Sequence, residues 1–290
     1  MDNPGAQPLQ QEHRNLQNLY DSLKPLIWRL YVDEANNPNR NGTLTAFAVG
    51  PGLLMTCAHG DWLNYKQLQI TAKCLNKNGT FNGSVVARKV NCDMVIVRIR
   101  GEGVEEMEVA RFGSGKLEVG ETIMAFGHPW HLFASGMVGH NVYPCVDNPE
   151  FDLNDKVTCR KYLHDSLPEP PICRIMAHVW NRDIFNWARD DPTDMRNLSF
   201  EKNLLANCPI IHAAGMICGP GSSGAPVFNV KGELVGMHVY GIKSFEVCIH
   251  VTALRAFLEN YLLRSGGGGS GGNASSSKGS ASRQKRGRHR

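Results

Sequence analysis

Residues 219–228 read Gly-Pro-Gly-Ser-Ser-Gly-Ala-Pro-Val-Phe, a glycine-rich turn that runs directly into an apolar strand. Gly221 and Gly224 permit backbone angles that a residue with a Cβ resists. Such a turn can point two backbone N–H groups at one spot beside the Ser223 hydroxyl, which is the geometry that an oxyanion hole requires. A hairpin signal at 229–233 leads into a second apolar run. Ser223 is therefore a candidate nucleophile, provided that a base lies elsewhere in the chain.

The chain supplies a base and an acid upstream of this turn. Residues 45–59 predict a strand, a Gly-Pro-Gly turn and a second strand that ends at His59, and Asp93 opens a further apolar strand. An imidazole can take the proton of a serine hydroxyl as the hydroxyl attacks. A carboxylate beside the imidazole holds its tautomer and stabilises the imidazolium that forms. The chain order of the candidate catalytic residues is therefore His59, Asp93 and Ser223.

Four segments in this order resemble the trypsin/chymotrypsin-like serine peptidases, and among them the Deg/HtrA type. They are Thr-Cys-Ala-His at 56–59, the strand at 93–99, Gly-Glu-Thr-Ile-Met-Ala-Phe-Gly-His-Pro at 120–129, and Gly-Ser-Ser-Gly-Ala-Pro at 221–226. The resemblance covers roughly residues 26–262. Ala225 stands where the family's motif usually has a second Gly, and Ala is small enough to make this a mild departure.

The resemblance implies an all-β fold of two six-stranded Greek-key barrels, with a short N-terminal helix and a C-terminal helix. The expected parts are an N-terminal segment and helix (1–25), a first barrel (26–115), a second barrel (116–264) with an insertion at about 144–205, and a disordered Gly/Ser linker and basic tail (265–290). No PDZ domain is expected. First-barrel strands are predicted at 26–32, 43–49, 53–57, 67–73, 84–90 and 93–99.

Three further segments carry open alternatives. The apolar positions of 9–23 and 252–263 have helical spacing, and both helices are expected to pack on the barrels, the second of them on the second barrel. The first helix has a partner-binding role as its alternative. The insertion is expected to be a lid or a substrate-recognition segment, with an oligomer contact or a surface elaboration as the alternatives.

The function that the resemblance implies is a serine endopeptidase that cleaves protein or peptide substrates through an acyl-enzyme, without a cofactor. Ser223 is the expected nucleophile, with Ser222 as its fallback, and the backbone N–H groups of Gly221 and Ser223 are expected to form the oxyanion hole. A catalytically silent, protein-binding member of the family is the alternative. Homo-oligomers are possible, since HtrA relatives are often trimers.

The specificity pocket can be predicted in outline from the trypsin-like arrangement. Its base is expected at Ile217 and Cys218, before the nucleophile, and its wall at Met237, His238 and Val239. The absence of an acid near Ile217 disfavours Lys or Arg at the cleaved position. Two preferences remain: an apolar residue, as in HtrA relatives, or Gln or Glu bound by His238, because residues 236–241 resemble a picornaviral main-protease segment.

Composition excludes several other classes. Six of the 31 Lys and Arg residues and none of the 27 acids lie in 265–290, so that 25 basic residues face 27 acids in the rest. A broad basic surface for nucleic acid is not expected, although the basic tail could contact nucleic acid, tether the chain to an anionic surface or act as a nuclear address. No signal peptide or membrane span is predicted, and an intracellular location, cytoplasmic or nuclear, is expected.

Metal binding has little support in the sequence. The nine cysteines include no Cys-x-x-Cys pair and are expected to be free thiols. His128, His131 and His140 lie near Cys145, but this spacing matches no known ligand set.

Overall fold

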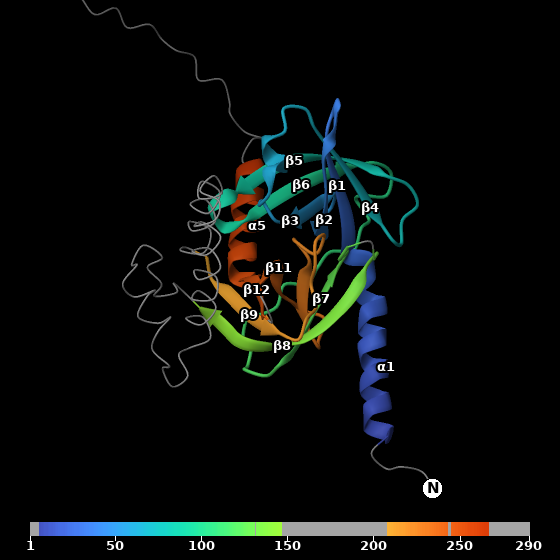
Figure 1. The fold of residues 1–290 in the computed structure, drawn as a ribbon, viewed down its shortest axis with the longest axis vertical. Coiled ribbons are helices and arrows are strands. Elements are labelled where there is room, and N and C mark those ends of the chain that lie inside the picture. The colour runs from blue at the N-terminus through green and yellow to red at the C-terminus, as the bar shows by residue number, and fades with distance from the viewer. Residues whose placement is uncertain (1–5, 131, 147–207, 243–244, 267–290) are drawn as a thin grey trace, which may run out of the picture.

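Two closed barrels of six antiparallel strands form most of the fold (Figure 1). The structure is a computed structural model that describes residues 6–130, 132–146, 208–242 and 245–266. The strands of the first barrel are β1 (Ile27–Glu34), β2 (Asn37–Gly50), β3 (Leu53–Thr56), β4 (Leu68–Cys74), β5 (Phe81–Lys89) and β6 (Met94–Arg100). Those of the second are β7 (Thr122–Gly127), β8 (Ser135–Val146), β9 (Ile210–Ala214), β10 (Pro226–Asn229), β11 (Leu234–Ile242) and β12 (Phe245–His250).

The two barrels have the same connectivity. The first closes in the order β1-β2-β3-β6-β5-β4, and the second repeats this pattern as β7-β8-β9-β12-β11-β10. The fold predicted from the sequence is confirmed, although β2 begins at Asn37 rather than at residue 43. The predicted insertion falls almost wholly on residues outside the described ranges.

Each barrel is filled by apolar side chains from alternate strand positions. In the first barrel Trp28 is fully buried and meets Phe81 edge to face, with ring centroids 5.4 Å apart. The second barrel has its own buried cluster, which includes Ile123, Ile211 and Val227. Burial of these side chains closes each sheet and leaves the loops between strands to form the candidate site.

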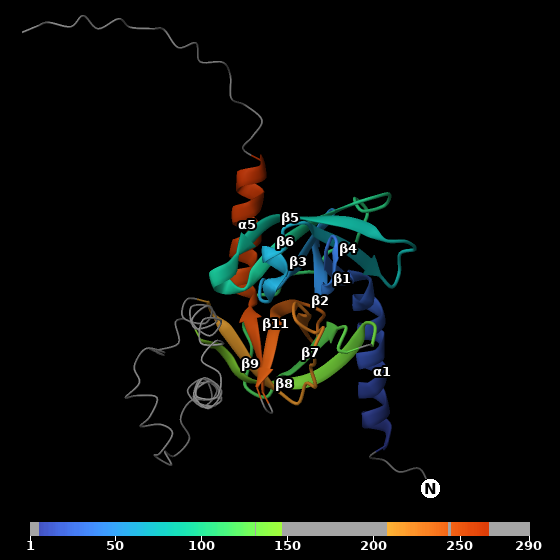
Figure 2. The same cartoon turned by 45° about the horizontal axis from the view of Figure 1, so that its top comes forward.

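The helices lie on the outside of the barrels, as Figures 1 and 2 show. They are α1 (Ala6–Leu23) and α5 (Val251–Gly266), with short 3₁₀ helices η1 (Lys24–Leu26), η2 (Asp61–Asn64) and η3 (Val90–Cys92). The Tyr20 hydroxyl of α1 donates to the Ala134 carbonyl at 2.6 Å, and its ring lies 5.6 Å from that of Phe126. The predicted packing of the first helix on a barrel is therefore confirmed.

The C-terminal helix contacts both barrels, whereas the sequence placed it on the second alone. Arg98 of β6 donates to the Tyr261 hydroxyl at 2.8 Å, and Arg255 donates to the Gly113 carbonyl. Close contacts also join α5 to β11 and β12. In the described part of the chain, no helix is both long and apolar enough to cross a membrane.

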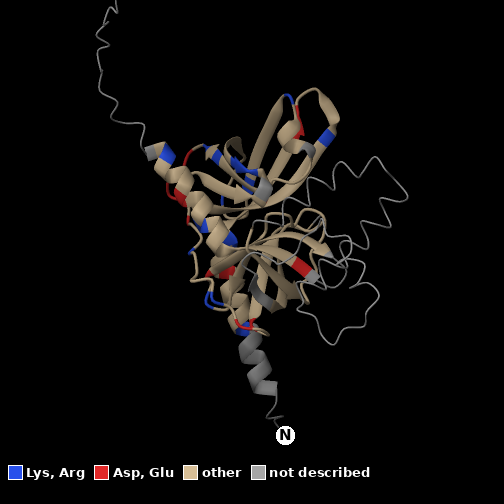
Figure 3. Ribbon diagram, turned by 90° about the vertical axis from the view of Figure 1, so that its left-hand side faces the viewer, with Lys and Arg blue, Asp and Glu red and all other residues tan. Residues whose placement is uncertain are grey.

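Charged residues of both signs are interspersed over the barrels and helices in Figure 3. This distribution agrees with the near balance of acids and bases outside the basic tail.

Candidate active site

The three predicted catalytic side chains meet between the barrels. His59 follows β3, Asp93 precedes β6 and Ser223 precedes β10. His59 Nδ1 lies 2.7 Å from Asp93 Oδ2, and His59 Nε2 lies 2.9 Å from Ser223 Oγ. The first barrel thus supplies the imidazole and carboxylate, and the second supplies the hydroxyl.

The Asp93 carboxylate is held by three N–H groups. Its Oδ2 faces the His59 ring, and its Oδ1 accepts the backbone N–H groups of Ala58 and His59, each at 2.6 Å. Asp93 is buried, and its φ of +51° places it in the left-handed region, where it ends η3. That turn aims the carboxylate back at the end of β3, and the Asp93 contact favours a His59 tautomer with the proton on Nδ1.

Burial by itself would lower the pKa of His59, but charges on Cys57 and Asp93 and hydrogen bonds with both residues would together raise it well above its ordinary value. The Cys57 thiol lies 3.8 Å from His59 Nε2, yet burial raises the pKa of Cys57 and keeps it neutral. We therefore attribute the raised pKa of His59 to the charge and hydrogen bond of Asp93.

Two glycines shape the loop around Ser223. Gly221 has φ +97° and Gly224 has φ +87°. A Cβ on Gly221 would collide with the His128 carbonyl oxygen, and one on Gly224 would collide with the Thr45 carbonyl oxygen. Both positions therefore require glycine on grounds of space and of backbone angle.

Thr45 of β2 joins this loop to the first barrel. Its N–H donates to the Ser223 carbonyl at 3.0 Å, and its hydroxyl donates to the Gly221 carbonyl at 2.7 Å. The same hydroxyl accepts the His128 N–H at 3.0 Å. Thr45 is fully buried, and the sequence analysis missed it, because a threonine in a predicted strand gives no sign of contacts with another barrel.

No family model matches the sequence, and no curated protein matches it either. Solved structures do match in fold. Deg5 superposes with a TM-score of 0.58 at 16% identity, over 88% of this chain and 97% of that one. The active form of the Rv3671c protease from M. tuberculosis gives a TM-score of 0.55 at 13% identity, over 83% of this chain and 82% of that one. The chain has the trypsin-like serine protease fold.

Within this trypsin-like fold, only part of the predicted specificity pocket comes together. Cys218 and His238 are neighbours, and the Val239 carbonyl lies 3.2 Å from Ser223 Oγ. Met237 is fully buried in the core, and Ile217 is 73% exposed. The predicted base and wall therefore do not line one continuous surface.

An acid that the sequence analysis did not find lies beside this pocket. The buried Glu246 of β12 places Oε2 2.7 Å from His238 Nε2, and its Oε1 accepts the Cys218 N–H at 3.4 Å. The residues around Ile217, where an acid was sought, contain none. Glu246 comes from the next strand, and the register that pairs Gly241 with Glu246 brings it to the site.

In the histidine group near residue 128, His128 is buried and hydrogen-bonded to the backbone. His128 accepts the Ala134 N–H through Nδ1 at 2.9 Å, and burial, with a smaller effect of Arg29, lowers its pKa to about 4. Neither His128 nor His140 belongs to a cluster of three potential ligands among the described residues. His131 lies outside the described residues.

The cysteines were predicted to be free thiols, and no disulfide joins the six whose side chains the structure describes: Cys57, Cys74, Cys92, Cys208, Cys218 and Cys248.

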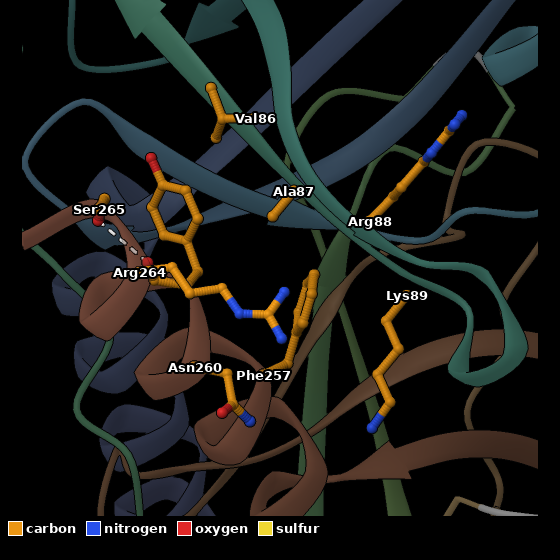
Figure 4. Close-up of a pocket in the computed structure, with 9 residues that line it drawn as sticks. Val86, Ala87, Arg88, Lys89, Phe257, Asn260, Arg264 and Ser265 are labelled. Atoms are coloured by element: carbon orange, nitrogen blue, oxygen red, sulfur yellow. Dashed lines mark hydrogen bonds between the residues drawn. The ribbon is translucent and has the colours of Figure 1, made fainter. Parts of the chain in front are cut away.

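A groove of about 610 Å³ lies outside the triad, between β5 and α5 of the trypsin-like fold. Figure 4 shows its lining, which combines the cations of Arg88, Lys89 and Arg264 with the ring of Phe257. It contains no triad residue, so its chemistry is separate from that of Ser223.

Proposed function

We propose that the protein is a serine endopeptidase in which Ser223 attacks the scissile carbonyl and an acyl-enzyme forms. The observation that carries this proposal is the continuous chain of contacts from Asp93 through His59 to Ser223, at 2.7 and 2.9 Å. The solved protease structures support the proposal through their fold, which this chain shares. At 13–16% identity they support the fold alone.

In the proposed reaction His59 acts first as a base and then as an acid. Nε2 takes the hydroxyl proton as Ser223 Oγ bonds to the substrate carbonyl carbon, and it then gives that proton to the leaving amine. Asp93 stabilises the imidazolium between these steps. Water, deprotonated by the same Nε2, then cleaves the acyl-enzyme and restores Ser223.

We assign the stabilisation of the oxyanion to the backbone N–H groups of Gly221 and Ser223. The Pro220 carbonyl accepts the Trp130 N–H at 2.6 Å, and the Gly221 N–H points to the opposite side of that trans peptide. Within the described part of the chain, neither N–H has a hydrogen-bond acceptor. Two unused donors beside the nucleophile support a preformed oxyanion hole.

A fluorophosphonate probe tests the proposal. We expect covalent labelling of the intact chain, mapped by mass spectrometry to Ser223, and cleavage of an unfolded protein substrate. Ser223→Ala should lose labelling and about 10⁶-fold in kcat, as in other triads, whereas Ser222→Ala should keep Ser223 labelled. A folded chain that takes no label would instead support the catalytically silent binding module.

A further inference from the structure

Three side chains that commonly bind metal ions converge behind the candidate nucleophile. They are Cys218 from the loop after β9, His238 from β11 and Glu246 from β12. Their potential ligand atoms all lie within 4.8 Å of one another. We propose that these three residues form a Zn²⁺ site, and that the bound ion inhibits cleavage by filling the specificity pocket.

The ligand chemistry fits Zn²⁺ and disfavours Mg²⁺ and Ca²⁺. One sulfur, one imidazole nitrogen and one carboxylate oxygen are ligands that Zn²⁺ accepts together, whereas Mg²⁺ and Ca²⁺ take oxygen ligands. Zinc–ligand bonds of about 2.0–2.3 Å in a tetrahedral arrangement separate the ligand atoms by about 3.3–3.6 Å. Because the three ligand atoms lie within 4.8 Å of one another, side-chain movements on the order of 1 Å would reach that geometry.

The His238 ring is already positioned for coordination through Nε2. Nε2 and Glu246 Oε2 are hydrogen-bond partners at 2.7 Å, and a potential ligand atom of each residue lies within 4.8 Å of Cys218 Sγ, so that a bound ion would replace this hydrogen bond. Nδ1 lies 3.4 Å from the Ser222 carbonyl oxygen, an acceptor of the kind that fixes the tautomer of a metal-bound histidine. On binding, the ring proton moves from Nε2 to Nδ1, and the Cys218 thiol releases its proton to solvent.

Among the described residues, the more exposed Cys218 offers the ion a route of entry. His238 and Glu246 are buried, whereas Cys218 is only half-buried, so access is from the Cys218 side. A Cβ on Gly241 would lie 2.6 Å from Glu246 Oε2, so glycine at this position keeps space over the carboxylate.

The inhibitory effect follows from the position of the site and rests on the proposed peptidase function. The His238 carbonyl accepts the Gly224 N–H at 2.9 Å, and the next carbonyl, that of Val239, lies beside Ser223 Oγ. An ion with three protein ligands keeps a fourth position open for water. Ion and water would therefore occupy the space that the substrate side chain needs.

Metal binding is tested in a His59→Ala/Ser223→Ala background, which removes the triad imidazole from the other potential ligand cluster, Cys57, His59 and Asp93. Equilibrium dialysis against Zn²⁺ should give one ion per chain. Cys218→Ser and Glu246→Gln should each weaken binding at least about tenfold. Cys74→Ser in the first barrel is the matched control and should retain it. With Co²⁺ as the probe, a thiolate charge-transfer band should appear and should be absent in Cys218→Ser.

Inhibition is tested in the chain with its triad intact, each variant being compared with its own metal-free rate. Zn²⁺ should inhibit the parent and EDTA should restore the rate, while Cys218→Ser should resist a Zn²⁺ concentration that halves the parent rate. The site is overturned if the folded background takes up no Zn²⁺, or if uptake is unchanged by both Cys218→Ser and Glu246→Gln. If Zn²⁺ uptake depends on Cys218 and Glu246 as expected but the chain has no peptidase activity, the zinc site is supported and only the proposed function is rejected.

Discussion

The Thr45 hydroxyl makes two hydrogen bonds in a place that excludes water. It donates to the Gly221 carbonyl at 2.7 Å and accepts the His128 N–H at 3.0 Å. Because Gly221 carries one of the proposed oxyanion donors, Thr45 is a positioning residue for the loop of the second barrel. Its substitution should therefore affect both stability and turnover.

We expect Thr45→Val to lower the free energy of unfolding by about 1–3 kcal/mol, since it leaves a buried carbonyl and a buried N–H without their partner. The same change should reduce kcat more than it raises KM, because the Gly221 loop loses its anchor. Thr45→Ser keeps the hydroxyl and should retain most of the free energy of unfolding and most of kcat. Urea unfolding and peptide kinetics measure them, and an equal loss of kcat in the two variants would contradict a role for the hydroxyl.

The His59–Asp93 pair determines the expected pH dependence of activity. Only neutral His59 can accept the Ser223 proton, and its pKa lies well above the ordinary value of about 6.5. Cleavage should therefore be lost as pH falls through this raised pKa and should increase toward alkaline pH.

In Asp93→Asn the charge that raises the pKa of His59 is absent, while burial of the ring remains. The acid limb of the profile of kcat/KM against pH should move to lower pH, and kcat should fall about 10⁴-fold, as in a comparable triad. Steady-state kinetics over a range of pH values measure both changes. An acid limb that stays in place would show that Asp93 does not set the pKa of His59.

At the scale of elements, the β11–β12 pairing determines which substrate side chain we expect the proposed pocket to accept. This pairing brings Glu246 next to His238. The Glu246 carboxylate should repel a Glu or Asp side chain at the cleaved position. Of the two substrate side chains that His238 was predicted to bind, Gln and Glu, only Gln is therefore expected. Other side chains with an N–H donor are also suitable. We expect peptides with Gln or Lys at that position to exceed those with Glu at least about tenfold in kcat/KM.

Glu246→Gln should reduce that ratio, because it removes the repelling charge and keeps the shape of the side chain. Ile217→Ala is the matched control, since Ile217 is largely exposed and should not affect the ratio. A peptide library assayed with a chelator present measures these preferences. A uniform preference for apolar residues that Glu246→Gln leaves unchanged would support the HtrA-like alternative.

Short motifs in chain order, through their resemblance to trypsin-like peptidases, were enough to predict both barrels and the meeting of His59, Asp93 and Ser223. Glu246 and Thr45 were not predicted, because their roles depend on pairing and packing that the local sequence does not encode. Glu246 reaches His238 only through the register of two strands, and Thr45 reaches Gly221 only when the barrels pack together. The cluster of Cys218, His238 and Glu246 was missed for the same reason, since its members lie in three separate segments.

At the scale of the whole molecule, α5 is a physical link between the barrels. It packs on β11 and β12 of the second barrel, and its Tyr261 accepts a hydrogen bond from Arg98 in the first. The buried faces of Leu254 and Phe257 add apolar contacts along the same helix. Because the candidate site lies between the barrels, a loss of α5 should disturb both halves of the site.

We expect truncation before residue 251 to lower amide protection in β6 as well as in β12, since the helix stabilises both strands by burial. Hydrogen exchange read by mass spectrometry resolves the two strands. Tyr261→Phe is the milder variant: it removes only the hydroxyl that meets Arg98, and should cost about 1 kcal/mol. If truncation reduces protection in β12 but leaves β6 unchanged, the helix belongs to the second barrel alone, and its contact with Arg98 adds no measurable stability.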